Sequence, residues 1–86
     1  MTLCLRKEDL DWRDIADEIV ALDAQGAVYL AVQGSGAVLW RLLAESTTRD
    51  GLVEALVETY GIDATRAGDD VDEFLTTLNE QGLLVS

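Results

Sequence analysis

The sequence predicts an α+β fold in which two or three N-terminal antiparallel strands are followed by three α-helices. Strand-forming residues 17–32 fold back at the glycine-containing segment 24–26, three amphipathic helical segments follow, and residues 82–85 form a short apolar stretch. The chain has 86 residues, of which 49% are hydrophobic and 27% charged. We therefore expect a single domain, residues 1–86, that buries roughly 60 to 65% of its unfolded surface. Such a domain has one core and no room for a deep active-site cleft.

Two neighbouring segments predict a β-hairpin. Residues 19–22 and 27–32 are β-branched or apolar over strand length, and the turn between them contains a glycine. Alternate side chains of a strand point to opposite faces, so Val28 and Leu30 share one face while Tyr29 points to the other. One face then covers the core, and the other offers a smooth apolar surface.

The segment before the hairpin is harder to interpret. Residues 3–5 form a candidate first strand, and residues 6–17 are strongly charged. Within the charged segment the apolar residues are Leu10, Trp12 and Ile15, and their spacing is ambiguous between the helical and the strand period. The sequence therefore predicts two or three strands at this end of the chain.

Glycine and hydroxyl residues mark the limits of the first two helices. Paired glycines in residues 33–36 break the preceding strand, and residues 36–45 then form a helix that is apolar on most sides. The hydroxyl groups of residues 46–48 can cap a second helix, whose apolar residues recur at helical spacing. Gly61 supplies a left-handed end to that helix.

The third helix, residues 64–81, has the clearest amphipathic pattern. Asp63 is a suitable N-cap because its carboxylate can accept hydrogen bonds from free N–H groups of the first turn. Gly82 ends the helix. The apolar residues that recur at three- and four-residue steps include Ala67, Val71, Phe74, Leu75 and Leu78. Strands beside a helix-turn-helix arrangement define a winged helix-turn-helix domain.

The net charge of −11 limits the classes of partner. Residues 50–86 contain nine acidic side chains and a single cation, Arg66. Binding to phosphates requires clustered Lys and Arg, so we expect no nucleic-acid partner, although a winged helix usually reads DNA. A dimeric winged-helix transcriptional regulator or a protein-interaction module stays open as the alternative. An acidic face that only keeps the protein in solution is an equally ordinary explanation of the charge.

Composition also predicts the compartment. Cys4 is the only cysteine, so no intrachain disulfide can form, which is typical of a reducing environment. The apolar runs are too short to span a bilayer, and residues 1–5 do not resemble a secretory signal. We expect a cytoplasmic protein with no membrane partner.

The side-chain inventory argues against catalysis. Without histidine, neither a Cys-His nor a Ser-His-Asp arrangement can form, and we expect no enzymatic activity, no cofactor and no metal site. The segment 34–36 lacks the glycine spacing and the lysine of a P-loop, so it predicts a tight turn. No Asp-Ser-Leu motif is present to carry a phosphopantetheine arm. An edge strand beside an apolar helix instead suits the capture of an extended peptide by strand addition.

Five motifs, in order, resemble those of the PqqD-like family. They are residues 36–43 (GAVLWRLL), Thr48 with residues 52–53, residues 60–63 (YGID), residues 70–78 with their Val, Phe and Leu positions, and residues 82–84 (GLL). Members of the family are RiPP recognition elements, which bind leader segments of ribosomally made peptides. The chain is most similar to the stand-alone leader-binding proteins of lasso-peptide pathways. One departure is Gln33, where many relatives have an Asn cap before the first helix.

The resemblance implies a site and a set of partners. The leader would pair with the strand residues Val28, Tyr29, Leu30 and Ala31. It would lie in a groove against the third-helix residues Ala67, Asp70, Val71, Phe74, Leu75 and Leu78. Buried leader side chains would contribute roughly 1.5 to 3 kcal/mol each. We expect about half of the apolar helix stripe to be ordinary core, and Asp70 to be the best candidate for a polar contact. The leader would then be delivered to a leader peptidase of the transglutaminase-like cysteine protease type, and a cyclase would act after it.

Overall fold

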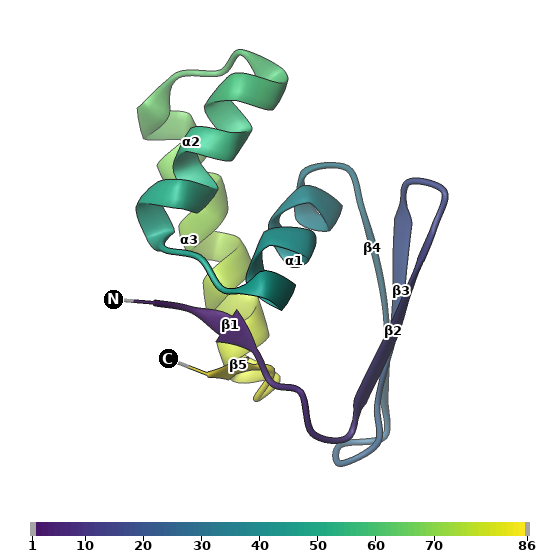
Figure 1. Ribbon diagram of the computed structural model, residues 1–86. Coiled ribbons are helices and arrows are strands. Elements are labelled where there is room, and N and C mark those ends of the chain that lie inside the picture. The colour runs from purple at the N-terminus through teal and green to yellow at the C-terminus, as the bar shows by residue number, and fades with distance from the viewer. Residues whose placement is uncertain (1, 86) are drawn as a thin grey trace.

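The computed structural model describes residues 2–85, with Val28 described by its backbone alone. The elements in chain order are β1 (Cys4–Leu5), β2 (Leu10–Ile15), β3 (Glu18–Asp23), β4 (Val28–Gln33), α1 (Ser35–Glu45), α2 (Arg49–Tyr60), α3 (Ala64–Glu80) and β5 (Leu84–Val85). Figure 1 shows the three-stranded sheet on one side of α1 and the other two helices on the opposite side. This arrangement confirms the predicted α+β class, with antiparallel strands before three helices.

The strands form two separate antiparallel sheets. The larger sheet has the order β2-β3-β4, and the smaller one pairs β1 with β5. Ile15 lies opposite Glu18 and Asp23 opposite Val28, so a two-residue and a four-residue turn connect the three long strands. The pairing of β3 with β4 confirms the predicted hairpin, and the pairing of β1 with β5 confirms that the two short apolar ends are extended.

The register gives the large sheet a covered face and an open face. Ile19 and Ala21 are buried and α1 packs against β3 and β4, while Tyr29 is 67% exposed on the opposite face. Leu22 lies opposite Tyr29 in the register and is also exposed. The alternation predicted from the sequence is therefore confirmed for the hairpin strands.

The sequence pattern does not indicate β2, so four strands rather than the predicted two or three precede the helices. Leu10 and Trp12 point toward the core, but the next inward position is Asp14, which accepts a hydrogen bond at 2.9 Å from Arg41 of α1. The outward position Ile15 is apolar and 58% exposed. Because the inward Asp14 is polar and the outward Ile15 is apolar, the alternation of apolar and polar residues that identifies a strand is lost in this part of β2.

Local hydrogen bonds explain where α2 and α3 begin. Thr48 Oγ1 accepts from the backbone N–H of Gly51 at 3.0 Å, and Asp63 Oδ1 accepts from that of Arg66 at 2.8 Å. Gly61 ends α2 in the left-handed conformation, with φ of 66°. These caps confirm the limits predicted from the sequence. In the described part of the chain, no helix combines the length and the hydrophobicity that crossing a bilayer requires.

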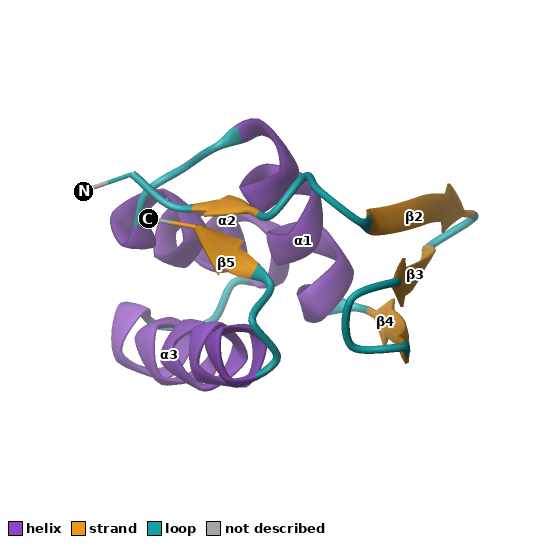
Figure 2. Ribbon diagram, turned by 90° about the horizontal axis from the view of Figure 1, so that it is seen from below, coloured by secondary structure: helices purple, strands orange, loops and turns teal. Residues whose placement is uncertain are grey.

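The core lies where α1 meets the sheet on one side and α2 and α3 on the other. Trp40 of α1 is fully buried, and Trp12 of β2 packs its ring edge-on against it at a centroid distance of 6.1 Å. Leu43, Leu52 and Leu56 are also fully buried. Figure 2 shows α1 between the sheet and α3.

Candidate functional site

Strand β4 leaves one edge of the large sheet open. It pairs with β3 on one side, and among residues 2–85 no strand pairs with its other side. An edge strand presents unpaired N–H and C=O groups, to which an extended chain can add. β2 is the other outer strand of the sheet. We consider β4 as the binding edge because a groove lies near the end of this strand.

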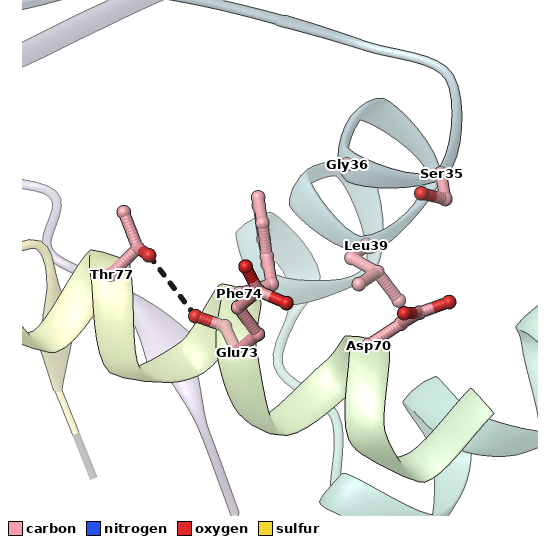
Figure 3. A pocket seen from close by; sticks show the side chains of 7 residues that line it. All are labelled: Ser35, Gly36, Leu39, Asp70, Glu73, Phe74 and Thr77. Carbon is pink, nitrogen blue, oxygen red and sulfur yellow. Dashed lines mark hydrogen bonds between the residues drawn. The ribbon is translucent and has the colours of Figure 1, made fainter. Parts of the chain in front are cut away.

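A groove of about 310 Å³ lies between the first turns of α1 and the middle of α3. Its walls are Ser35, Gly36 and Leu39 from α1 and Asp70, Glu73, Phe74 and Thr77 from α3. Figure 3 shows these residues, with the Phe74 ring reaching from α3 toward α1, the Glu73 carboxylate beside it and the Asp70 carboxylate near Leu39. We refer to this hollow as the α1–α3 groove.

Gly36 connects this groove to the open strand. A methyl group at Gly36 would lie 2.6 Å from Val32 Cγ1 and 3.3 Å from Phe74 Cε1. Both distances are shorter than ordinary packing contacts, so the absence of a side chain at Gly36 allows α1, β4 and α3 to approach closely at this point. The Phe74 ring therefore lies close to the end of the edge strand.

The groove is acidic. Asp70 and Glu73 are exposed, and neither takes part in the ion pairs formed by residues 2–85. Asp72, on the same helix, is instead paired with Arg49 of α2, with Nη2 and Oδ2 3.0 Å apart, and this hydrogen bond lowers the pKa of the Asp72 carboxyl group. Of these three acids of α3, Asp72 is thus neutralised by α2, while Asp70 and Glu73 line the groove.

The cap of α1 differs from those of the other helices. Its N-cap is Gly34, with φ of 60°, and no side chain caps the first turn. The Gln33 side chain instead donates a hydrogen bond to the carboxylate of Glu18 in β3. The partial positive charge of the uncapped turn is compatible with the nearby acids of α3.

The residues expected to bind a peptide fall into two groups. Tyr29, Ala31 and Asp70 are exposed, and Leu30, Phe74 and Leu75 are partly buried. Three others are core residues, since Ala67 and Val71 are fully buried and Leu78 is 3% exposed. In this structure these three side chains belong to the core and are not accessible on the surface of the groove. The side chain of Val28 lies outside the described residues.

The contribution of α1 to the candidate site was not predicted from the sequence. Ser35, Gly36 and Leu39 line the groove, as do Glu73 and Thr77, whose hydroxyl group donates to the backbone carbonyl of Glu73 at 3.0 Å. The available signal was the small residues at positions 34–36, which are compatible with a close approach of neighbouring elements as well as with a turn. In the described chain, no three His, Cys, Asp or Glu side chains are grouped closely enough to hold a metal ion.

The fold and the groove define a small winged helix-turn-helix protein with an open strand edge beside an acidic, partly apolar hollow. The chain belongs to the PqqD family, because the family model described as "Coenzyme PQQ synthesis protein D (PqqD)" matches residues 18–84. The family predicted from the sequence is therefore confirmed. A search of curated proteins gives no match.

Two solved structures resemble the protein over nearly its whole length. TbiB1 in complex with the TbiA(beta) leader peptide is 28% identical, with a TM-score of 0.85, and the similarity covers 91% of each chain. Lasso peptide synthetase B1 complexed with the leader peptide is 20% identical, with a TM-score of 0.83 and 98% of each chain covered. At that lower identity the second structure supports the fold alone.

Proposed function

We propose that this protein is a non-catalytic recognition module that binds the leader segment of a ribosomally synthesised precursor peptide, and that the precursor belongs to a lasso-peptide pathway. The observation that carries the proposal is the open edge of β4 beside the α1–α3 groove. Family membership and the similarity to TbiB1, which was solved with a leader peptide, support it.

The exposed and partly buried residues take distinct roles in this proposal. The backbone of β4 pairs with the leader and sets its register, while the partly buried Phe74 contacts apolar leader side chains in the groove and the buried Leu39 lies beneath them. Asp70 accepts hydrogen bonds from the leader backbone or pairs with a leader lysine or arginine. The buried residues Ala67 and Val71 hold α3 in place against the core.

The pathway partners belong to the same proposal. The bound leader would be presented to a leader peptidase of the transglutaminase-like cysteine protease type, and a cyclase would then close the ring of the product. A cytoplasmic location is also part of it, because a ribosomally made precursor is first available there.

Strand addition can be tested with modified peptides. The probe is a synthetic leader of the precursor encoded beside this protein, for which we expect a micromolar or lower Kd by calorimetry. Two further versions carry N-methyl groups on alternate amides, in opposite phase. Only alternate N–H groups of an added strand face its partner, so one version should bind nearly as well as the parent and the other more than about tenfold more weakly. Equal affinities for the two versions, or no binding of the parent peptide, would contradict the proposal.

A matched pair of variants tests the groove. Phe74→Ala removes a groove side chain and should weaken leader binding by about tenfold. Thr76→Ala, on an exposed part of the same helix, should leave the affinity unchanged. Thermal melting followed by circular dichroism shows whether each variant is folded, and Phe74→Leu, which retains most of the apolar volume, should have an intermediate affinity.

A further inference from the structure

A second pocket continues the α1–α3 groove beyond the end of β4. It has a volume of about 260 Å³ and is lined by Gly34, Ser35, Leu56, Tyr60, Ile62, Arg66 and Asp70. Ser35 and Asp70 line both hollows, so the two are neighbours along α3. We refer to this hollow as the α2–α3 pocket. A peptide that pairs with β4 and continues past Gln33 reaches the shared residues first and the α2–α3 pocket next.

The walls of the α2–α3 pocket are suited to an apolar side chain. Leu56 is fully buried and Ile62 partly buried, while Tyr60 remains 46% exposed. The left-handed Gly61 between Tyr60 and Ile62 turns the chain so that residues on both sides of it line the same hollow. A partly exposed aromatic ring beside a small apolar hollow is typical of a binding surface.

Charge changes sign along the groove-facing side of α3. Arg66, Asp70 and Glu73 follow at steps of four and three residues, which places them on one side of the helix. The cations Arg6, Arg41 and Arg49 are each paired with an aspartate, whereas the ion pairs of the described residues do not include Arg66. The α2–α3 pocket therefore has the cation Arg66 as well as the shared Asp70 in its lining, whereas the lining of the α1–α3 groove has two carboxylates and no cation.

We propose that the α2–α3 pocket is a second subsite for the leader peptide. It takes an apolar side chain from the part of the leader that extends past the residues paired with β4, and Arg66 pairs with an acidic residue next to that side chain. This inference rests on the proposed function, because continuity with the α1–α3 groove is what identifies the leader as the occupant. The sign change along α3 then fixes the register of the leader as well as its orientation.

The apolar part of the subsite is tested with Tyr60→Ala. The probe is the synthetic leader described above, labelled with fluorescein, and the readout is its anisotropy on titration with protein. Tyr60→Ala should weaken binding by about tenfold, as is usual when an aromatic contact is truncated in an interface. Val85→Ala is the matched control, because Val85 is exposed to a similar extent, 47%, but lies in β5, away from both hollows. It should bind like the parent protein.

The charged part is tested with Arg66→Glu against Lys7→Glu. Both substitutions change the net charge by the same amount, and Lys7 is an exposed residue of the β1–β2 connection. Arg66→Glu should weaken binding several-fold and Lys7→Glu should not. Replacing the acidic leader residues by alanine one at a time should identify one position whose loss weakens binding to the parent protein but not to Arg66→Glu, as expected for a coupled pair.

The outcomes separate this inference from the proposed function. If the parent protein and the Phe74→Ala variant behave as expected but Tyr60→Ala and Arg66→Glu bind like the parent, the second subsite is wrong and leader binding stands. If the parent protein does not bind the leader, both are wrong. Equal losses with Arg66→Glu and Lys7→Glu would also overturn the subsite, because they would show a general charge effect.

Discussion

Asp23 is a single side chain that joins three parts of the molecule. It lies at the end of β3 and is 3% exposed, and Arg6 of the β1–β2 connection donates to its carboxylate. The same guanidinium donates to the backbone carbonyl of Gly82, beyond α3, at 2.9 Å. Burial raises the pKa of the Asp23 carboxyl group, but hydrogen bonds from Arg6 and from the backbone N–H groups of Gln25 and Gly26 outweigh burial and lower the pKa. Ionised Asp23 therefore holds the β3–β4 turn to the helical part of the fold.

This interaction predicts how stability depends on pH. The pKa in the folded state lies below the ordinary value of 3.8, so the stabilisation is complete above that value and is lost as the pH falls through the folded-state pKa. Asp23→Asn should therefore lower the free energy of unfolding at neutral pH, and its difference from the parent protein should shrink well below pH 3.8. Urea unfolding over a range of pH measures this. Asp11→Asn, on an exposed side of β2, should change little at any pH, and a difference for Asp23→Asn that is independent of pH would contradict the prediction.

Among the elements, those set by local chemistry were predictable and those set by distant contacts were not. Thr48, Gly61 and Asp63 fix the limits of α2 and α3 through bonds to residues next to them in sequence, so their roles follow from residue type. In β2, the inward position of Asp14 is explained by its hydrogen bond from Arg41, which is 27 positions away. No local period can indicate such a contact.

The same distinction applies to the candidate site. A helical period identifies the apolar stripe of α3 but does not say which members face the core, and Ala67, Val71 and Leu78 proved to be buried. The contribution of α1 arises because Gly36 allows α1, β4 and α3 to approach one another. That approach is a property of the tertiary packing, so the sequence predicted one wall of the groove and missed the other.

Gly36 links the packing of the elements to binding, and this predicts the effect of Gly36→Ala. The added methyl group would lie 2.6 Å from Val32 Cγ1, so the Val32 side chain, β4 or α1 must shift. Overpacking of this kind costs about 1 to 3 kcal/mol, while alanine gains up to about 1 kcal/mol in helix propensity. We expect a net loss of stability in urea unfolding and weaker leader binding, because the added methyl group crowds both Val32 of the edge strand and Phe74.

A double variant separates crowding from other effects of Gly36→Ala. Val32→Ala removes the methyl groups that the new side chain would meet, so adding Gly36→Ala to Val32→Ala should cost less than adding it to the parent protein. Additive losses of stability would show that the two sites are independent and that Gly36 has no packing role toward β4.

For the protein as a whole, the distribution of charge opposes DNA binding, which is the common function of winged-helix domains. A winged helix commonly inserts a helix into the DNA major groove, with cations against the phosphates. Here the net charge is −11, and α3 presents Asp69, Asp70 and Glu73 on its exposed surface. Three arginines are held in ion pairs with aspartates of the same chain, which reduces the number of cations that can meet a phosphate. An uncharged peptide backbone at an open strand edge meets no such repulsion.

This charge distribution predicts that the protein does not bind nucleic acid even at low ionic strength, where phosphate binding is strongest. Labelled duplex DNA and single-stranded RNA should migrate unchanged in a gel-shift assay with protein that binds the leader peptide in the same buffer. The leader serves as the control for active protein, so an absence of shift cannot be attributed to unfolding. A shift that weakens as salt is added would contradict the prediction and favour the winged-helix regulator, because displacement of counterions is the signature of phosphate contacts.

If leader binding shows little dependence on salt in parallel titrations, its affinity comes mainly from strand pairing and apolar burial, whereas a steep dependence would assign a larger share to Asp70, Glu73 and Arg66.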